Sequence, residues 1–254
     1  MNKAFLFLLL LIHSSCISLL LHSQLKRMGA FDEACKLTYL SNEEKEVAFL
    51  AMHHIGKKAF YEDVATKVDS LQKAGFFVFY EGYSDESPED SLANDRNERK
   101  LRKVLGVALE AYLDTVNHTV LGIKIRKKNA RALVNQPGLT ALGIDTLTSR
   151  RVDISPAKMM EVFEQKHGEV ILDSCDLKTS LSSLTYNCQD LGSKLQDAFF
   201  EEIVFKLRDQ HLAGEIQQHS GAKIAVVYGS MHLRGLRVEL GKLDERWAYL
   251  TEKN

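Results

Sequence analysis

Two apolar stretches of this chain, far apart in sequence, both end in histidine. The first, 47–52, runs into His53 and His54, and the second, 225–231, runs into His232. Each pattern predicts a buried strand that delivers an imidazole to its carboxyl end, where open α/β sheets form their ligand sites. We therefore predict that two imidazoles meet in one cleft.

The adjacent pair His53 and His54 supplies only one of these imidazoles. Neighbouring side chains of a strand point to opposite faces, so one of the two enters the cleft and the other does not. The register shared with His232 selects His54, and His53 is a secondary candidate. A single histidine at a strand end also fits a purely structural role, and it is the repetition that favours a ligand role.

A carboxylate and a guanidinium complete the candidate site. Glu81 follows the apolar stretch 76–80, and Arg208 lies within a long helical pattern. Two imidazoles and one carboxylate can bind a transition metal and leave coordination positions open, which is how hydrolytic metal sites activate water. A nearby arginine can bind an anionic group or stabilise an oxyanion. Taken singly, Glu81 also fits a solvated turn and Arg208 an exposed helix charge.

The elements that position these residues follow from the spacing of apolar side chains. The stretch 46–52 predicts a strand, 57–74 predicts an amphipathic helix, and 76–80 predicts a second strand. A helix of this length between two strands predicts a βαβ unit with parallel strands.

The rest of the pattern predicts a further series of elements. They are a short helix at 31–40, a loop at 84–97, a helix at 98–113, a strand at 151–154, a helix at 157–166, a strand at 168–172, a long helix at 194–218 and a strand-rich tail at 237–250. Because the strand that ends in histidine occurs twice, we expect two related strand–helix halves in one sheet. The predicted fold class is α/β, a single domain with a mainly parallel central sheet and helices packed around it.

The composition is that of a folded protein with a core. Of the 254 residues, 45% are hydrophobic and 26% are charged, which is ordinary for a globular chain. The formal net charge of −1 provides no basic field for nucleic acid. We therefore expect no nucleic-acid partner, whereas the peptide or small-molecule substrate that we expect is implied by a family resemblance of the motifs.

Residues 1–23 have the pattern of an export leader. A short basic start precedes the apolar run 4–12, and no charged residue occurs between Lys3 and Lys26. A cleaved signal peptide, a bacterial lipoprotein leader lipidated at Cys16, and an uncleaved membrane anchor all fit. We expect an exported protein of the periplasm, cell envelope or membrane surface, in which 24–44 connect the leader to a domain at 45–254.

The cysteines also bear on whether the protein is in an oxidising compartment. Cys175 and Cys188 lie in one polar segment, and an oxidising compartment would allow them to form a disulfide bond. Free buried cysteines are the alternative, and the sequence does not decide between the two. The cysteines do not have the paired short spacing of a zinc site.

Four short blocks resemble the ordered signature of the TraB/GumN superfamily. They are 52–56 with 60–61, 78–82, 207–209 and 229–232. That superfamily includes TIKI-type metalloproteases, and erythromycin esterases and ChaN-like lipoproteins are regarded as relatives. Its pattern is Gly-x-x-His after a first strand, glutamate after the next, Arg-Asp or Arg-Asn on a late helix, and a second Gly-x-x-His.

The resemblance implies a peptide or ester hydrolase built on one α/β domain. It implies that His54, Glu81 and His232 bind a divalent metal ion (Mn²⁺, Co²⁺ or Zn²⁺) or act as base, and that Arg208 positions or stabilises the substrate. A first alternative, similar to the ChaN-like branch, is a lipoprotein that binds haem or iron without catalysis. A second alternative is a family member with a degenerate site, because Ala51 stands where the first block often has glycine.

Two further residues are secondary candidates for the site. Gly229 keeps the glycine of the second Gly-x-x-His block. Asp153 places a carboxylate in an otherwise apolar short strand, between Val152 and Ile154. An outward-facing strand position is the explanation we favour for Asp153, so it stays a secondary candidate.

Overall fold

The computed structural model describes residues 20–82, 91–107, 113–120, 123–124 and 132–250. The predicted leader at 1–23 falls almost wholly outside these residues, apart from its end, where 20–27 are helical. In the part of the chain that is described, no helix combines the length and apolar composition needed to cross a membrane.

The core of the protein is a mixed, mainly parallel sheet of six strands. Its order is β11 (Ala248–Tyr249), β1 (Leu37–Ser41), β2 (Glu46–Met52), β10 (Lys223–Gly229), β4 (Phe77–Tyr80) and β9 (Ser149–Arg151). The strands from β2 to β9 pair in parallel, whereas β1 pairs antiparallel with both β2 and β11. The predicted α/β fold class, a single domain with a mainly parallel central sheet, is confirmed.

The two strands predicted to end near histidine are direct neighbours. β2 and β10 pair in register from Glu46 with Lys223 to Met52 with Gly229. The predicted strands β2 and β4 are both present and parallel, but β10 lies between them. Because β10 is apolar and buried on both faces, it occupies the centre of the sheet, as continuous apolar runs do in parallel sheets.

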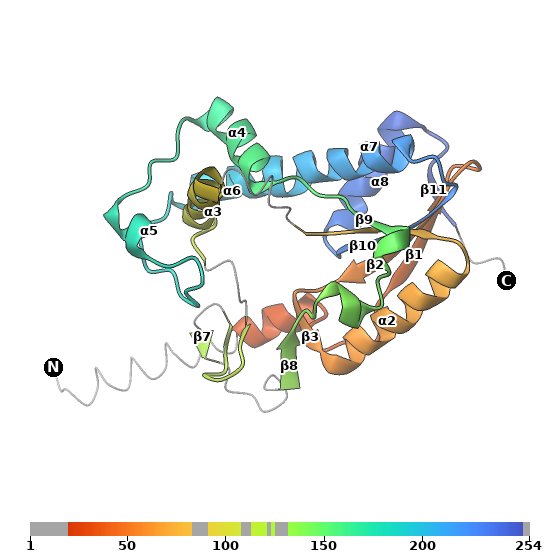
Figure 1. The fold of residues 1–254 in the computed structure, drawn as a ribbon, viewed down its shortest axis with the longest axis horizontal. Coiled ribbons are helices and arrows are strands. Elements are labelled where there is room, and N and C mark those ends of the chain that lie inside the picture. The colour runs from red at the N-terminus through yellow and green to blue at the C-terminus, as the bar shows by residue number, and fades with distance from the viewer. Residues whose placement is uncertain (1–19, 83–90, 108–112, 121–122, 125–131, 251–254) are drawn as a thin grey trace.

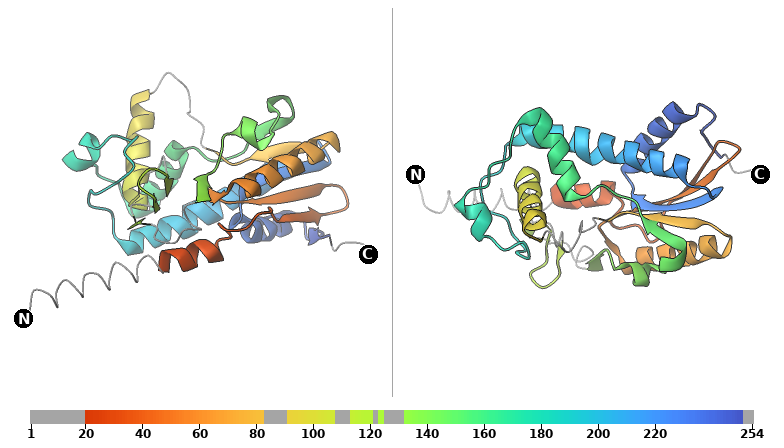
Figure 2. Two further views of the ribbon diagram at one scale, coloured as in Figure 1. Left: turned by 90° about the horizontal axis from the view of Figure 1, so that it is seen from below. Right: turned by 45° about the horizontal axis from the view of Figure 1, so that its top comes forward.

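Helices cover both faces of the sheet (Figures 1 and 2). Helix α2 (Lys58–Lys73) lies on one face, and α7 (Arg208–Gln218) and α8 (His232–Leu243) lie on the other. The alternation of β2 explains this arrangement: Ala48 and Leu50 pack toward α2, whereas Val47 and Phe49 pack toward α7 and α8. The helix predicted at 57–74 is confirmed as α2.

The long helix predicted at 194–218 is present, with a change of winding at its centre. It consists of α6 (Ser193–Phe199), the π-helical segment η5 (Phe200–Leu207) and α7. A π-helical turn is rare and is frequently found at functional sites. Here it ends immediately before Arg208.

A second layer of helices lies beside the sheet. It contains α3 (Ser91–Leu105), α4 (Pro156–His167), α5 (Ser174–Lys178) and α6, of which α3, α4 and α6 share an apolar cluster around Met160, Phe163 and Phe199. Smaller elements complete the described chain. They are β3 (Ile55–Lys57) paired with β8 (Leu133–Asn135), the three-stranded sheet of β5 (Leu113–Asp114), β6 (Thr119–Val120) and β7 (Ile123–Lys124), and the 3₁₀ turns η3 (Leu139–Leu142) and η4 (Thr146–Thr148).

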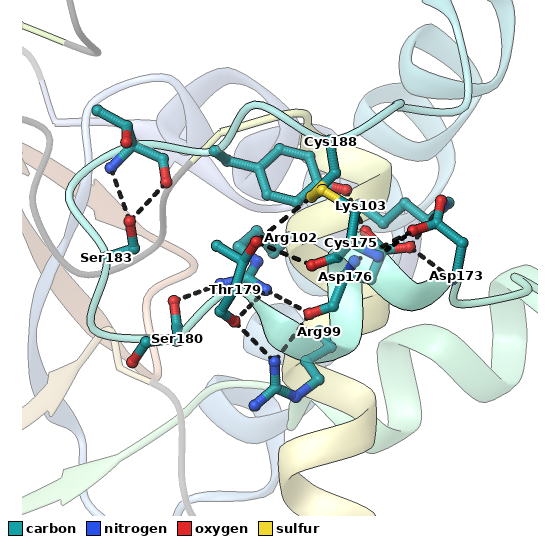
Figure 3. The surroundings of a disulfide bond; sticks show 12 residues. Arg99, Arg102, Lys103, Asp173, Cys175, Asp176, Thr179, Ser180, Ser183 and Cys188 are labelled. Carbon is teal, nitrogen blue, oxygen red and sulfur yellow. Dashed lines mark hydrogen bonds and ion pairs between the residues drawn. A yellow bond between two sulfur atoms is a disulfide. The ribbon is translucent and has the colours of Figure 1, made fainter.

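Cys175 and Cys188 form a disulfide bond that closes the segment after α5 (Figure 3). The backbone of this segment accepts hydrogen bonds from α3: Arg102, which is fully buried, donates to the carbonyl oxygens of Thr179 and Ser180. Lys103 binds the buried carboxylate of Asp176 at 2.5 Å. The disulfide thus closes a segment whose backbone carbonyl oxygens accept hydrogen bonds from both terminal nitrogens of a buried arginine.

Several predicted elements were wrong. The helix predicted at 98–113 is present as α3, but it begins earlier, at Ser91 within the predicted loop 84–97, and ends at Leu105, and strand β5 begins at Leu113; residues 83–90 and 108–112 lie outside the description. The helix predicted at 31–40 is absent: 31–36 have no regular structure and strand β1 begins at Leu37, and 168–172 contain no strand. The strand at 151–154 is shifted to β9, and the tail predicted as strand-rich at 237–250 is helical as far as Leu243, with β11 as its strand.

These errors have physical causes. The first turns of α3 are polar and charged, so its apolar positions, Leu101 and Val104, appear only in its last turns. The residues of α8 that pack on the sheet, Leu233, Leu236 and Leu240, follow helical spacing and were detectable.

Replacing both Cys175 and Cys188 by serine should lower the free energy of unfolding by about 3 kcal/mol, because the bond closes a short loop with a sequence separation of 13. Guanidinium unfolding followed by circular dichroism measures this loss. Wild-type protein in a reducing buffer is the control and should unfold at the midpoint of the variant. Equal midpoints for the oxidised wild type and the variant would contradict the prediction.

Candidate functional site

The site forms where the carboxyl ends of four neighbouring strands meet. Backbone hydrogen bonds continue past the strand ends: Ser230 N–H donates to Met52 O, and Glu81 N–H donates to Val227 O. Val152 N–H donates in the same way to Tyr80 O. The segments that follow β2, β10, β4 and β9 are therefore held side by side, although they are far apart in sequence.

The guanidinium group of Arg208 is the centre of this cluster. Arg208 is 4% exposed and projects from the first residue of α7. Its Nη2 donates to Glu81 Oε1 at 2.6 Å and to Asp153 Oδ2 at 2.8 Å, and its Nε donates to Asp153 Oδ1 at 2.7 Å. Burial alone would lower the pKa of Arg208, but the neighbouring phenol and carboxylates raise it well above its usual value. The guanidinium is therefore a permanent buried cation.

Glu81 is held by donors on both of its carboxylate oxygens. Oε1 accepts from Arg208, and Oε2 accepts from the backbone N–H of Gly229 at 2.7 Å. Burial alone would raise the pKa of Glu81, but Arg208, His54 and His232 outweigh it and lower the pKa below the usual 4.5. The side chain is therefore ionised at neutral pH.

Asp153 is the second carboxylate that binds Arg208. Its side chain is 1% exposed, and its Oδ1 also accepts from the phenol of Tyr228 at 3.0 Å. The side chain of Asp153 thus points inward, so the alternative of an outward-facing strand residue was wrong. The guanidinium also lies over the Tyr228 ring, 5.2 Å from its centroid.

A third carboxylate, that of Asp209, orients the imidazole ring of His232. Its Nδ1 lies 2.7 Å from Oδ1 of Asp209, and its Nε2 lies 3.4 Å from Nη1 of Arg208. Both His232 and Asp209 are 4% exposed. We assign the Nδ1–H tautomer from this hydrogen-bond network, because Nδ1–H can donate to Asp209. Nε2 then carries the lone pair.

The contact between Asp209 and His232 requires a glycine on α8. A Cβ atom at Gly235 would lie 1.7 Å from Asp209 Oδ2, so only glycine allows the carboxylate to lie against this helix. Burial raises the pKa of Asp209, and the hydrogen bond from His232 only partly offsets that effect.

The two neighbouring histidines occupy the outer side of the cluster. His54 is exposed, and its charge is one of the influences that lower the pKa of Glu81. The Nδ1 atom of His53 lies 3.5 Å from the hydroxyl of Ser230. Burial lowers the pKa of His53, so its ring is neutral at neutral pH.

The structure brings most of the sequence candidates into one hydrogen-bonded cluster. Glu81, Asp153, Arg208, Gly229 and His232 are joined by the contacts given above, and His54 lies within electrostatic reach of Glu81.

Sequence reasoning missed three residues of the site. Asp209 stands in the Arg-Asp dipeptide that was recognised as a block, so a signal for it was present. Ser230 likewise lies within the block 229–232, whereas the type of Tyr228 did not distinguish it from ordinary residues of a buried strand.

The arrangement does not fit a metal ion held jointly by His54, Glu81 and His232. Both oxygens of Glu81 face N–H donors, and the imidazole Nε2 of His232 faces the Arg208 cation. A divalent cation here would displace these contacts and lie beside a buried positive charge. No group of three or more metal-ligating side chains is found within the residues that the structure describes. Metal binding by these residues stays a prediction from the sequence.

A cavity of about 390 Å³ lies beside the cluster. Asp209, Phe205 and Met231 are among the residues that line it, and the ring of Phe205 lies 5.7 Å from that of His232. Of the cluster, Asp209 lines this cavity, whereas His232 and Arg208 are not among its lining residues.

Replacing Gly235 by alanine should displace Asp209 from His232 and lower the free energy of unfolding by about 1–3 kcal/mol, because the added methyl group overlaps the carboxylate. Gly241→Ala is the matched control, since a Cβ there meets no atom within 4 Å and lies on the same helix. We expect the control to be neutral or more stable by up to about 1 kcal/mol. Denaturant unfolding tests both variants, and equal effects would contradict the close approach.

Replacing Glu81 by glutamine should destabilise the protein at neutral pH by about 1–3 kcal/mol, because Arg208 loses one charged partner. The pKa of Glu81 is lowered on folding, so its stabilisation is present above pH 4.5 and is lost as the pH falls below that value. The difference between wild type and variant should therefore shrink below pH 4.5. Glu245→Gln, at an exposed position, is the control and should show no such trend.

No protein-family model, curated protein or solved structure matches this chain. The resemblance to the TraB/GumN superfamily therefore rests on its four sequence blocks. The function must be argued from the geometry of the cluster.

Proposed function

We propose that this chain is a hydrolase of carboxylic ester or peptide bonds, with the Arg208 cluster as its active site. The observation that carries the proposal is the pairing of His232 with Asp209 directly beside a buried arginine. An imidazole oriented by a carboxylate is the usual arrangement of a general base in acyl hydrolysis. The adjacent buried cation supplies the charge that an oxyanion needs.

The first role belongs to His232. Because Nδ1–H donates to Asp209, the lone pair of Nε2 can accept a proton from a water molecule that attacks an acyl carbon. In the unliganded site Nε2 faces Arg208 Nη1, and the lone pair becomes available when a substrate oxygen takes that N–H. The same proton can then pass to the group that leaves. Asp209 keeps the ring in this tautomer and orientation, and so acts as a positioning residue.

The second role belongs to Arg208. Glu81 and Asp153 occupy its Nε and Nη2 donors, which leaves Nη1 directed toward His232. An acyl oxygen that becomes negative beside His232 would receive an N–H from this group. Since the two carboxylates already hold the guanidinium in place, little reorganisation is needed when the charge develops.

The location of the proposed hydrolase follows from the leader and the disulfide. The leader pattern at 1–23 favours export to the cell envelope. The disulfide between Cys175 and Cys188 supports this proposal, because such bonds persist in oxidising compartments. The haem- or iron-binding and degenerate-site alternatives stay predictions from the sequence.

Replacing His232 by alanine should lower kcat/KM for p-nitrophenyl esters by about 10²–10⁴, the usual contribution of a general base. His211→Ala is the matched control, because His211 lies on α7 with Arg208 but outside the cluster. The control should keep wild-type turnover. Turnover should also survive dialysis against a chelator, because the proposed roles belong to protein side chains.

Three outcomes would count against the proposal. Wild-type turnover in the His232 variant would remove the assigned base. Absence of hydrolysis of any ester or peptide probe by the wild type would remove the activity. Near-stoichiometric metal that is lost in a His54→Ala/His232→Ala double variant would replace the proposed roles by metal ligation.

A further inference from the structure

We propose that Ser230 is the nucleophile of this site and that His53 is its base, so that hydrolysis passes through an acyl ester on the Ser230 hydroxyl. The inference rests on the proposed hydrolase function and adds a covalent step to it. It also assigns a role to the member of the histidine pair that does not lie in the Arg208 cluster.

The position of Ser230 in the fold is the first argument. β10 ends at Gly229, and α8 begins at His232, so Ser230 lies in the turn between a central parallel strand and a helix. Nucleophilic serines of α/β hydrolases occupy such a strand–turn–helix junction. Its backbone is held in place, because Ser230 N–H donates to Met52 O at 3.0 Å.

The contact between Ser230 and His53 is the second argument. Ser230 Oγ lies 3.5 Å from His53 Nδ1, and both residues are half-buried. These residues follow β10 and β2, which are neighbours in the sheet with Gly229 opposite Met52. The pairing of the strands thus brings a hydroxyl and an imidazole together. The distance between them can shorten to that of a strong hydrogen bond when substrate binds.

The surroundings of His53 orient its ring. The hydroxyl of Tyr61 donates to the backbone carbonyl of His53 at 2.8 Å, and the ring of Phe60 lies 4.9 Å from the imidazole ring. On the opposite side of the ring lies Gly29, whose φ is +79°. A Cβ there would lie 2.7 Å from His53 Nε2 and 2.8 Å from Asp32 Oδ2. The Asp32 carboxylate is therefore on the Nε2 side, where it favours the imidazolium that forms when Nδ1 takes a proton.

The covalent step requires no reactant other than the substrate and water. Ser230 Oγ bonds to the acyl carbon while its proton moves to His53 Nδ1, and the carbonyl bond opens to an oxyanion. The backbone N–H groups of the first turn of α8 have no intrahelical partners and can donate to that oxygen. When the tetrahedral intermediate collapses, the alcohol or amine leaves with the proton from His53.

Water then releases the acyl group. It attacks the carbon of the acyl ester, and His232 takes its proton as described above. The bond between the acyl carbon and Ser230 Oγ then breaks, the carboxylic acid leaves, and the proton held by His232 passes to Oγ, which restores the hydroxyl. The sum is ester or amide plus water, giving acid plus alcohol or amine.

The test is covalent labelling of the full-length protein with a fluorophosphonate, which phosphonylates activated serines. Intact mass spectrometry and peptide mapping should find a single adduct on Ser230. The adduct should be lost in Ser230→Ala, and its rate of formation should fall by about 10² in His53→Gln. Ser220→Ala is the matched control, because Ser220 is exposed at the amino end of the same strand, and its adduct should equal that of wild type. Circular dichroism confirms that each variant is folded.

Ester hydrolysis by the same proteins separates this inference from the proposed function. Labelling at Ser230 together with loss of turnover in Ser230→Ala supports both. If the wild type is not labelled and Ser230→Ala keeps its turnover, Ser230 is not the nucleophile, and the proposed hydrolase function is unaffected. Labelling at Ser230 without turnover supports the nucleophile and overturns the assigned reaction, and the absence of both overturns both.

Discussion

The buried guanidinium of Arg208 is the constraint on which the site depends. It holds two carboxylates, Glu81 and Asp153, that would repel each other at this distance without it. Removing one partner of a buried ion pair leaves an unpaired charge and typically costs about 3–5 kcal/mol. The ends of β4, β9 and β10 are therefore coupled electrostatically as well as through the sheet, because each contributes a group to the same cation.

Two consecutive residues of one helix make different contacts in the site. Arg208 and Asp209 project from the start of α7 about 100° apart around the helix axis, so one reaches the carboxylates and the other reaches His232. The π-helical segment that ends at Leu207 sets the rotation of this start relative to α6. Gly235 completes the arrangement, because it alone allows Asp209 to lie against α8.

Much of the sheet was predictable because its strands are short and uniformly apolar. The pattern of β2 and the spacing of α2 each identified an element almost to its end residues. Polar helices were harder to predict, since α3 shows its apolar residues only in its last turns. For the site, Glu81, Arg208 and His232 were found because each stands at the end of, or within, a strongly patterned element, whereas the type of Tyr228 did not distinguish it from ordinary residues of a buried strand.

By itself, the sequence determined that two strands end near histidine and that a glutamate and an arginine accompany them. Only the tertiary structure decided which of these groups touch. The order of strands in a sheet depends on which apolar faces are buried together, and local spacing does not contain that information. The placement of β10 between β2 and β4 brings Ser230 to His53 and Glu81 to Gly229. The tertiary structure also places Arg208 against Oε1 of Glu81, an oxygen that a metal ion would otherwise bind.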